Sequence, residues 1–488
     1  MAWAWTCTTS CTYLFNYTLL VLLLLGLSSE SCYGLGTFGF AIHHRFSDPV
    51  KQILGFDGHP EKGSVEYYAA MAHRDRIIRG RHLAASNNQS PLTFANGNDT
   101  ASWGSLYYAH VSVGTPSLLF LVALDTGSDL FWLPCDCLNN NGCKTSLQTS
   151  SGQVTNLNIY SPSASSTSKN VPCNSNNLCD PNQCPSANSN CAYQISYVSN
   201  DTSTSGILVE DVLHLITDDG QSKAIDAQIT FGCGQNETGI FLEGAASNGL
   251  LGLGLNDISV PSTLARQGLV PNSFSMCFGP DGTGRISFGD NGSSDQRETP
   301  FTIEPSYPKY NVSITQITIG STASKLEFYA IFDSGTSYTN LRDPYYTFIA
   351  ESFNSYVTEK RHLSDSQIPF EYCYDLSANQ NVYAFPLINL TMKGGDQYVL
   401  TNPTVTWYSN QSGGYVHCLA LLQSGDLNTI GQNFMTGYRI VFNREKMVLG
   451  WKESNCYNDE NSNTLHSPML KAFTYTLVTL LVSIFAIV

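Results

Sequence analysis

The sequence predicts a mainly β protein that folds into two lobes. Its 488 residues are too many for one compact core, so two lobes are expected after processing. The 39 Gly, 26 Tyr and 24 Phe residues, with many Ser, Thr and Asn, favour short strands joined by turns over helical bundles. Apolar and polar residues alternate from Ile225 to Phe231 and from Arg285 to Phe288, which is typical of half-buried strands.

Residues 1–32 have the composition of a secretory signal peptide. An apolar core from Leu19 to Leu27 is followed by the small residues Ser28 and Ser29. The alternative is a signal-anchor helix that stays in the membrane. Secretion makes disulfide bonds the expected state of the cysteines.

Residues 33–101 differ in composition from the rest, and we expect them to form a propeptide. The segment has a basic run from Arg74 to Arg81 and holds five of the ten histidines: His43, His44, His59, His73 and His82. In this interpretation its positive charges cover an acidic cleft until the histidines are protonated during secretion. The alternative is an N-terminal arm without a special role.

The following residues are expected to form an N-terminal lobe at 102–297 and a C-terminal lobe at 298–456. Strands are predicted from His110 to the Gly-x-Pro turn that ends at Pro116, and from Val312 to Ile314. Few segments keep a helical period, and one of them runs from Pro344 to Val357.

Residues 135–191 form an insert with seven cysteines and Ser/Asn-rich spacers. Because no apolar core is available there, cross-links must hold the insert. A zinc cluster is the alternative, since Cys135, Cys137 and Cys143 are close in sequence, but the paired CxxC spacing of zinc sites is missing. We therefore expect no metal, and disulfides among an even set of twelve cysteines: Cys135, Cys137, Cys143, Cys173, Cys179, Cys184, Cys191, Cys233, Cys277, Cys373, Cys418 and Cys456.

Residues 457–488 have the pattern of a signal for a glycolipid (GPI) anchor. The last 17 residues, Ala472 to Val488, carry no charge and follow a short polar stretch. At about 1.5 Å per residue they span roughly 26 Å, less than the roughly 30 Å apolar core of a bilayer. A retained membrane helix is the alternative. Attachment is expected at one of the small residues before the polar stretch, namely Asn461, Ser462 or Asn463.

The net charge of −15 argues against nucleic acid as a partner, because an acidic surface repels phosphate groups. Such a surface repels itself least in acidic surroundings. We expect a monomer without a cofactor, held on the outer face of the cell membrane or released. Secretion would expose Asn-x-Ser/Thr sequons to glycosylation: Asn88, Asn98, Asn200, Asn236, Asn291, Asn311, Asn389 and Asn410.

Two short segments repeat one pattern some 208 residues apart. The first runs from Phe120 along an apolar strand to Asp125-Thr126-Gly127-Ser128, and the second from Phe328 to Asp333-Ser334-Gly335-Thr336. From composition alone, Asp-[Ser/Thr]-Gly should occur about 0.3 times by chance. The chain has two copies, each after an apolar strand. The alternative is a pair of ordinary strand-end turns.

This pattern suits a pair of catalytic carboxyl groups. An apolar strand delivers each carboxylate into a cleft of low dielectric, and the glycine allows the tight turn that aims it. The following hydroxyl can donate to a carboxylate oxygen. Two carboxylates about 3 Å apart repel by roughly 5 kcal/mol at an effective dielectric near 20, so they share one proton. The ionised member can then take a proton from water while the protonated member polarises a carbonyl group.

Several further segments resemble the pepsin-like aspartic proteases, and more closely the nepenthesin-like branch from plants. The likeness covers about residues 104–456. Trp132 stands where the family has its active-site tryptophan. Other matching segments are the first strand at Tyr107–Pro116, the loop behind the first aspartate at Gly249–Gly254, and the strands behind the second at Ile430–Phe434 and Tyr438–Trp451. A nucleotide loop is the alternative for the glycines at 249–254, but no Lys or helix start follows them.

The resemblance implies a bilobal pepsin-like acid protease fold, with two pseudo-symmetric β-domains and an active-site cleft between them. It implies an aspartic-type endopeptidase that acts on peptides or proteins through Asp125 and Asp333. The supporting residues would be Thr126, Gly127, Ser334 and Gly335, with Ser128 and Thr336 holding the outer carboxylate oxygens. The family also makes the disulfides Cys373–Cys418 and Cys233–Cys456 plausible.

The flap, a hairpin that closes over the substrate, departs from the family pattern of Tyr-Gly-Asp-Gly-Ser. The matching stretch here is Tyr197 to Thr202, which keeps the tyrosine but lacks both glycines. Asn200 and Asp201 are the tip residues that best tolerate a positive φ. The alternative function is a weak or silent binding or inhibitory protein on the same scaffold, which the altered flap leaves open.

Overall fold

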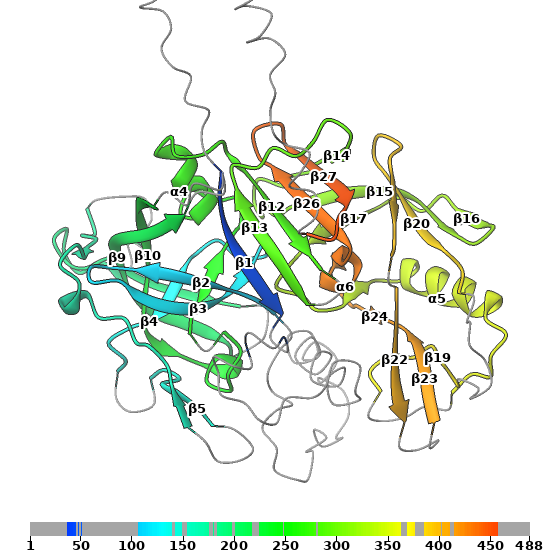
Figure 1. Cartoon of the computed structure of the whole chain (residues 1–488), viewed down its shortest axis with the longest axis horizontal. Coiled ribbons are helices and arrows are strands. Elements are labelled where there is room, and N and C mark those ends of the chain that lie inside the picture. Colours follow the sequence, from blue (N-terminus) through cyan, green and yellow to red (C-terminus); the bar gives the residue numbers. More distant parts are fainter. Residues whose placement is uncertain are drawn as a thin grey trace, which may run out of the picture. The chain divides into compact units, whose positions relative to one another are not determined.

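The computed structural model describes residues 37–44, 47, 50, 106–138, 142–148, 154–174, 179, 183–197, 201–216, 224–246, 248–279, 282–362, 368–375, 385–401, 403–409 and 414–456 (Figure 1). All of these belong to one compact unit, Thr37–Val488. The predicted signal peptide, most of the predicted propeptide and the predicted anchor signal lie outside the described residues. Those interpretations stay predictions.

The described residues form one large sheet of fourteen strands, in the order β14-β27-β26-β12-β13-β1-β2-β3-β11-β4-β10-β9-β7, with β8 paired to β9. Its strands are β1 (Phe38–His44), β2 (Tyr107–Val113), β3 (Leu118–Asp125), β4 (Trp132–Pro134), β7 (Lys169–Asn170), β8 (Ala192–Ser196), β9 (Ser203–Ile216), β10 (Ala224–Glu237), β11 (Leu250–Gly252), β12 (Ser273–Phe278), β13 (Thr283–Phe288), β14 (Arg297–Pro300), β26 (Tyr438–Asn443) and β27 (Val448–Glu453).

A second sheet of eight strands in the described residues has the order β21-β20-β15-β17-β25-β18-β24, with β16 paired to β15. Its strands are β15 (Asn311–Ile319), β16 (Thr322–Ser324), β17 (Phe328–Phe332), β18 (Thr339–Leu341), β20 (Ile388–Met392), β21 (Gln397–Val399), β24 (Leu421–Gln423) and β25 (Thr429–Ile430). Two small sheets contain β19 (Cys373–Asp375), β22 (Thr404–Ser409) and β23 (Gly414–Leu419), and β5 (Ser146–Gln148) and β6 (Val154–Asn156).

Helices are few and short in the described residues. They are α4 (Val260–Arg266), α5 (Tyr345–Tyr356) and α6 (Gln432–Met435), with the 3₁₀ turns η2 (Pro162–Ala164) and η4 (Gly239–Phe241). The helix predicted at 344–357 is α5, and the strands predicted near 110, 225, 285 and 312 are β2, β10, β13 and β15. The mainly β fold class is therefore confirmed.

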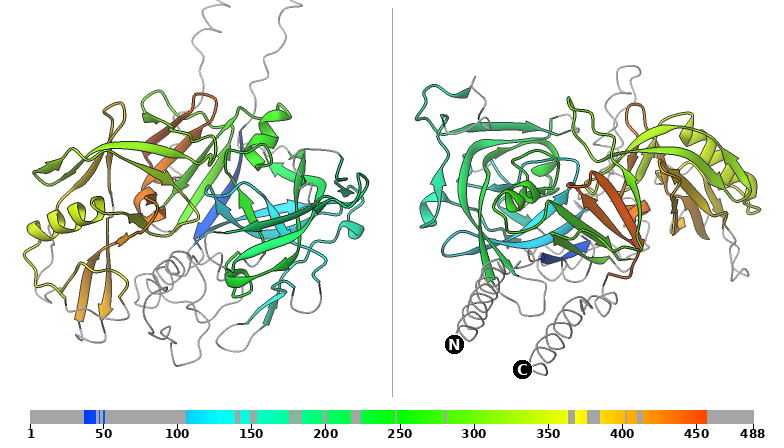
Figure 2. Two further views of the ribbon diagram at one scale, coloured as in Figure 1. Left: turned by 180° about the vertical axis from the view of Figure 1, so that it is seen from behind. Right: turned by 90° about the horizontal axis from the view of Figure 1, so that it is seen from above.

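The two predicted lobes meet in the large sheet, where β12 pairs antiparallel with β26. Phe274 of β12 lies opposite Phe442 of β26, and the two rings stack with centroids 4.7 Å apart. Figure 2 shows β26 and β27, coloured orange to red, beside the green strand β12 of the first lobe. The predicted boundary between 297 and 298 falls inside β14, which pairs with β27.

Strand β1 comes from the segment predicted to be a propeptide, and it lies between β13 and β2 in the large sheet (Figure 1). Phe38 and Ile42 are buried in the core, and Ile42 pairs with Gly284 of β13 and Ala109 of β2. Burial lowers the pKa of His43, so this imidazole resists protonation while β1 is in place. The histidine trigger itself stays a prediction.

All twelve cysteines after the leader are disulfide-bonded, so the cysteines of the insert are not zinc ligands. The pairs are Cys135–Cys233, Cys137–Cys143, Cys173–Cys184, Cys179–Cys191, Cys277–Cys456 and Cys373–Cys418. The expected pair Cys373–Cys418 is confirmed.

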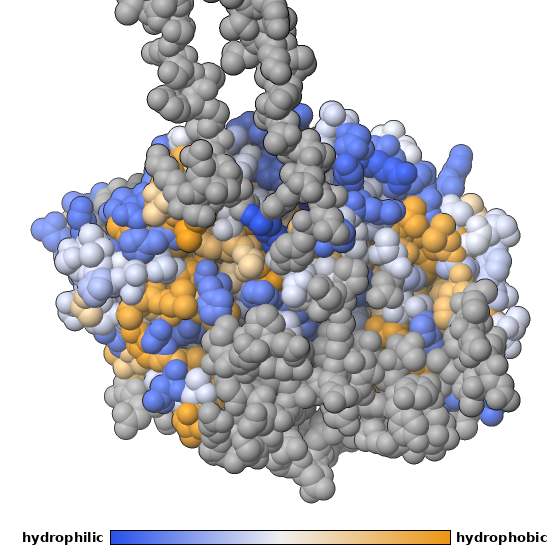
Figure 3. Space-filling model, in the orientation of Figure 1, coloured by the Kyte–Doolittle hydropathy of each residue, from blue (hydrophilic) through white to orange (hydrophobic). Residues whose placement is uncertain are grey.

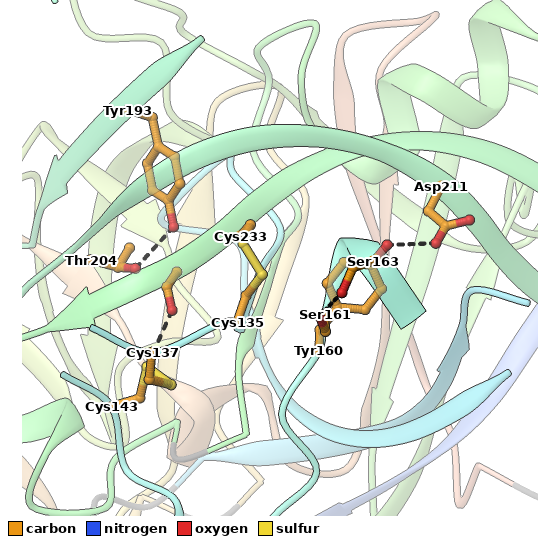
Figure 4. The surroundings of a disulfide bond; sticks show 11 residues. Cys135, Cys137, Cys143, Tyr160, Ser161, Ser163, Tyr193, Thr204, Asp211 and Cys233 are labelled. Atoms are coloured by element: carbon orange, nitrogen blue, oxygen red, sulfur yellow. Dashed lines mark hydrogen bonds between the residues drawn. A yellow bond between two sulfur atoms is a disulfide. The ribbon is translucent and has the colours of Figure 1, made fainter. Parts of the chain in front are cut away.

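The expected pair Cys233–Cys456 is wrong. The parallel pairing of β10 with β4 places Cys233 beside Leu133 and within reach of Cys135, to which Figure 4 shows it joined. Cys456 lies just after β27 and bonds instead to Cys277 of β12. The sequence did not reveal these two pairings because they depend on which strands lie side by side in the sheet.

Apolar and hydrophilic side chains are interspersed over the described part of the face in Figure 3. The most exposed large apolar residues are spread over separate elements: Leu119 of β3, Leu138 after β4, Val154 of β6, Ile216 of β9, Tyr329 of β17 and Leu387 before β20. Within the described ranges, no helix has the length and apolar character needed to cross a membrane.

Candidate active site

Both Asp-Thr/Ser-Gly segments stand at the end of a strand. Asp125 is the last residue of β3, and Asp333 comes immediately after β17. A further strand runs parallel to each of them: β11 places Gly252 beside Asp125, and β25 places Ile430 beside Phe332. The same arrangement therefore occurs once in each predicted lobe.

The glycines of the β11 segment serve close packing. A Cβ on Gly252 would lie 2.6 Å from the backbone nitrogen of Leu130, so a side chain does not fit there. The next two N–H groups are already used, since Leu253 donates to the Asp125 carbonyl at 2.9 Å and Gly254 to the Ser128 carbonyl at 2.8 Å. These groups brace the first aspartate loop and do not form a nucleotide loop.

The two loops hold each other through Thr126 and Ser334, which are both fully buried. Each backbone N–H donates to the other residue's hydroxyl: Thr126 N–H to Ser334 Oγ at 3.1 Å, and Ser334 N–H to Thr126 Oγ1 at 2.9 Å. Each hydroxyl in turn donates across the pair, Thr126 to the carbonyl of Phe332 at 3.0 Å and Ser334 to that of Leu124 at 3.1 Å. This exchange fixes one loop relative to the other.

Each carboxylate accepts two hydrogen bonds from its own loop. The oxygen Oδ1 accepts from the glycine N–H two residues on, and Oδ2 accepts from the hydroxyl three residues on. The donors to Asp125 are Gly127 at 2.8 Å and Ser128 at 2.6 Å. The donors to Asp333 are Gly335 at 2.8 Å and Thr336 at 2.7 Å.

The two carboxylates face one common space. A Cβ built on Gly127 would lie 2.8 Å from Oδ1 of Asp333 and 3.0 Å from Oδ1 of Asp125. The two Oδ1 atoms therefore border a single small volume. Asp125 is 9% exposed, so its carboxylate is largely buried. The arrangement can hold a water molecule within hydrogen-bond distance of both carboxylates.

Tyr197 lies near Asp125, and Trp132, which is fully buried, contacts Tyr197. The Trp132 indole N–H donates to the Tyr197 hydroxyl at 2.9 Å, and both rings contact Phe241, with centroids 4.9 Å and 5.0 Å away. Burial, and then the nearby Asp125 carboxylate, raise the pKa of Tyr197 well above its ordinary range. The Tyr197 hydroxyl is therefore a neutral group near the carboxylates.

Tyr197 belongs to a hairpin formed by β8 and β9, in which Ser196 pairs with Ser203. The Tyr197 N–H donates to the Thr202 carbonyl at 2.9 Å and closes the hairpin beyond the strands. Asp201 has a φ of +68°, so a non-glycine residue takes the left-handed conformation at this tip. Asn200 lies outside the described residues.

A cavity of 700 Å³ contains the facing carboxylates. Its lining comes from both predicted lobes: Asp125 and Tyr197 from the first, and Asp333 and Thr336 from the second. A cavity of this volume suits a segment of extended chain or a small ligand.

Lys309 and Tyr307, which sequence reasoning missed, also line this cavity. They lie between β14 and β15, and the Lys309 ammonium donates to the Gly127 carbonyl at 2.6 Å. No local motif marks these residues, because their role depends on a contact between positions 182 residues apart.

Among the sequons within the described residues, Asn291 is exposed. Asn236, Asn311 and Asn389 are half-buried, and the Asn389 amide group donates to Gln397 Oε1 at 2.5 Å. Asn410 lies outside the described residues. Asn291 is therefore the most accessible of these four positions to a glycan.

Two family models match most of the described chain. Residues 107–290 match the model described as "Xylanase inhibitor N-terminal", and residues 309–453 match the one described as "Xylanase inhibitor C-terminal".

Known proteins similar to this chain include plant aspartic proteases. The chain is 56% identical over 457 residues to "Aspartyl protease family protein 1" of Arabidopsis thaliana, covering 93% of this chain and 88% of that protein. It is 26% identical over 375 residues to "Aspartic proteinase nepenthesin-1" of Nepenthes gracilis, covering 72% of this chain and 78% of that one. Among solved structures, Basic 7S globulin from soybean has a TM-score of 0.55 at 22% identity, covering 72% of this chain and 91% of its own, a likeness of fold alone.

Proposed function

Because the chain belongs to the pepsin-like aspartic protease family, we propose that it is an endopeptidase in which Asp125 and Asp333 activate a water molecule. Its substrates would be peptides or proteins, as the family implies. The observation that carries this proposal is the common space between the two Oδ1 atoms, fixed by the exchange of hydrogen bonds between Thr126 and Ser334.

The mechanism follows from a pair of carboxyl groups that share one proton. The ionised aspartate takes a proton from the water molecule while the oxygen of that water forms a bond to the scissile carbonyl carbon. The protonated member donates to the carbonyl oxygen and stabilises the negative charge that develops there. The C–N bond of the tetrahedral intermediate then breaks while the aspartate that took the proton from water gives it to the leaving nitrogen. The other aspartate keeps or recovers its own proton, and a free carboxyl and a free amine result.

The hydrogen-bond donors around each carboxylate act both when water attacks and when the tetrahedral intermediate breaks down. Because Asp125 and Asp333 receive matching bonds from a glycine N–H and a hydroxyl, either one can hold the ionised state. The Tyr197 hairpin would cover the substrate and exclude water from the reacting atoms. The pair of supporting hydroxyls, Ser128 and Thr336, would keep the outer oxygens oriented through both steps.

Cleavage by the full chain, produced through a eukaryotic secretory pathway, tests this proposal. An unfolded protein substrate should be cut between about pH 3 and 6, with inhibition by a statine-type peptide. Asp125→Asn and Asp333→Asn, which preserve shape, should each lower kcat by at least about 10³-fold. The proposal fails if wild type and both variants share the same trace rate.

The second candidate is a binding or inhibitory protein on the same scaffold. The descriptions of the matched family models, which name xylanase inhibitors, and the glycine-poor flap favour it. In that case a folded wild-type protein would cut no peptide, and the two aspartate variants would behave like it.

We further propose a route through the secretory pathway to a glycolipid anchor on the cell surface. The support is the leader at 1–32 and the tail at 457–488 in the sequence. A phosphatidylinositol-specific phospholipase should release the protein from membranes. A protein that stays in the membrane after this treatment has a retained helix instead.

A further inference from the structure

Lys309 places a positive charge in the candidate active-site cavity. It comes from the stretch that joins the two lobes, between Pro300 at the end of β14 and Asn311 at the start of β15. Its ammonium crosses to the first lobe and donates to the Gly127 carbonyl at 2.6 Å. It also lies 5.0 Å from the centroid of the Tyr307 ring. The side chain is half-buried, so its charge is partly desolvated.

This charge has no carboxylate partner within the described part of the chain, where every ion pair involves other cations. Asp129, an acidic residue of the same cavity wall, is already engaged, since it accepts from the backbone and side-chain amides of Asn256 at 2.9 Å and 2.8 Å. An ammonium carries three N–H donors, and the Gly127 carbonyl uses one of them. Two donors therefore remain for a ligand.

The other charged groups of the cavity wall are acidic. They are Asp125, Asp129, Asp257 and Asp333, and Lys309 is the one basic residue among the described lining residues. In a chain with a net charge of −15, an acidic peptide is repelled over most of the surface. Lys309 is the exception inside the cavity, and it lies close to the reacting atoms because Gly127 itself donates to Asp125.

We propose that Lys309 is a specificity-determining residue that binds a Glu or Asp side chain of the substrate close to the scissile bond. A substrate carboxylate at this point pairs with the two remaining donors while Gly127 keeps the third. The exposed Tyr307 ring, which lies 5.0 Å from the Lys309 ammonium, would flank the aliphatic part of the substrate's Glu or Asp side chain. This inference rests on the proposed endopeptidase function and adds a preference to it.

The preference has a pH dependence that follows from the ligand. A substrate glutamate is mostly ionised only above its pKa of about 4.3. Ionisation of the substrate thus switches the attraction on between about pH 3.5 and 5.5. Packing by Lys309 alone would give no such change with pH.

The test uses matched peptides that carry Glu or Gln at one of the three positions on either side of a single cleavage site. With wild-type full chain at pH 5.5, the Glu peptide should have a kcat/KM about tenfold above the Gln peptide at one position, which corresponds to about 1.4 kcal/mol. The ratio should fall toward one at pH 3.5. Lys309→Met should abolish the preference, and Lys309→Arg should retain most of it.

Two further variants test whether the preference depends on the charge of Lys309. Lys309→Glu should reverse the charge preference, so that a Lys peptide is cut faster than its Gln counterpart. Lys393→Met removes an exposed lysine that does not line the cavity, and it should leave the Glu/Gln ratio as in wild type. Melting temperatures check that each variant is folded.

The outcomes separate the two proposals. If the peptides are cut and the Asp333→Asn variant abolishes cutting, but wild type shows no Glu preference or Lys309→Met keeps it, the assignment of Lys309 is overturned and the protease remains. If no peptide is cut at any pH by a folded wild type, the proposed function itself fails.

Discussion

Thr126 and Ser334 set the position of the reacting groups although neither is proposed to touch the substrate. Their four hydrogen bonds cross between the two aspartate loops, and both side chains are fully buried. Replacing a buried hydroxyl of this kind is costly, because the groups that were hydrogen-bonded to it lose their partner and no water can reach them. The geometry of the carboxylates therefore depends on residues one position further along the chain.

Thr126→Val tests this dependence, since it keeps the shape and removes the hydroxyl. The Ser334 N–H would lose its acceptor and the Phe332 carbonyl its donor, so unfolding should become easier by on the order of 2–4 kcal/mol. The two loops would also shift, and kcat should fall at least about tenfold. Urea denaturation and peptide cleavage measure the two effects.

Thr126→Ser is the matched control, because it keeps the hydroxyl and loses a methyl group. It should retain most of the activity of the wild type. A Val variant with wild-type kcat would show that the exchange of hydrogen bonds is not needed for the geometry.

Glu237 gives the first lobe a preference for acid conditions. It is 1% exposed, its Oε2 accepts only from the Lys144 N–H at 3.2 Å, and its Oε1 has no partner in the described residues. Burial raises its pKa to about 8. Since the folded state holds the proton more tightly than the unfolded chain, stability is full below about pH 4.5 and declines as the pH rises toward 8.

Glu237→Gln should remove this decline. At pH 4 the variant and the wild type should unfold alike, whereas at pH 8 the variant should be more stable by on the order of 4 kcal/mol. Thermal unfolding at both pH values measures the difference. The exposed Glu298→Gln serves as control and should shift the melting temperature equally at both. An equal gain for Glu237→Gln at pH 4 and pH 8 would contradict the assignment.

At the residue scale, the sequence predicted the site residues that stand in a repeated local motif. It did not predict residues whose role depends on contacts between positions far apart in the chain. Asp125 and Asp333 could be paired because each stands in the same short motif after an apolar strand. Lys309 could not be found, because nothing near it in sequence says that its ammonium reaches Gly127. The Cys277–Cys456 bond escaped for the same reason, since it depends on the pairing of β12 with β26, two strands that are far apart in sequence.

At the scale of elements, β1 is the main departure from the sequence-based picture. Charge and histidine content marked 33–101 as one segment, but residues 38–44 form a strand with its own buried side chains. Composition averages over a segment and so does not reveal a single strand inside it. The strand lies between β13 and β2, and therefore bridges the sheet region shared by the lobes and the strands that lead to Asp125.

Ile42→Ala tests whether β1 remains part of the working protein. The side chain is fully buried, so its truncation should lower the stability of unprocessed protein by about 2–5 kcal/mol. Ile216→Ala, at a position that is 55% exposed, should change it by less than about 0.5 kcal/mol. Melting temperatures of unprocessed and processed protein give the answer. If processing removes β1, the processed proteins made from the wild type and from the Ile42→Ala variant should have the same melting temperature.

At the scale of the whole molecule, the site exists only when the two lobes are joined. Each lobe supplies one carboxylate at the end of a strand that has a parallel neighbour, and the length, composition and repeated motif together predicted this duplication. The joining region was less predictable, since β26 and β27 pair with β12 and β14 of the preceding part of the chain. Local sequence patterns predict where strands form, but they do not predict which strands pair with each other.

The junction should therefore control activity more tightly than it controls the fold of either lobe. Phe442 stacks on Phe274 and also contacts Tyr310 at a centroid distance of 4.7 Å, and the Tyr310 hydroxyl donates to the Leu253 carbonyl behind the first aspartate loop at 2.7 Å. In Phe442→Ala the lobes should loosen at this contact, so that peptide cleavage is lost at a lower urea concentration than the far-UV signal of the strands. Phe353→Ala, in the buried core of α5 and away from the junction, should have a similar stability loss of about 3–5 kcal/mol but lose both signals together. If cleavage and strand signal also coincide in Phe442→Ala, the lobes separate only on complete unfolding, and the paired carboxylates are held by the crossed hydroxyls alone.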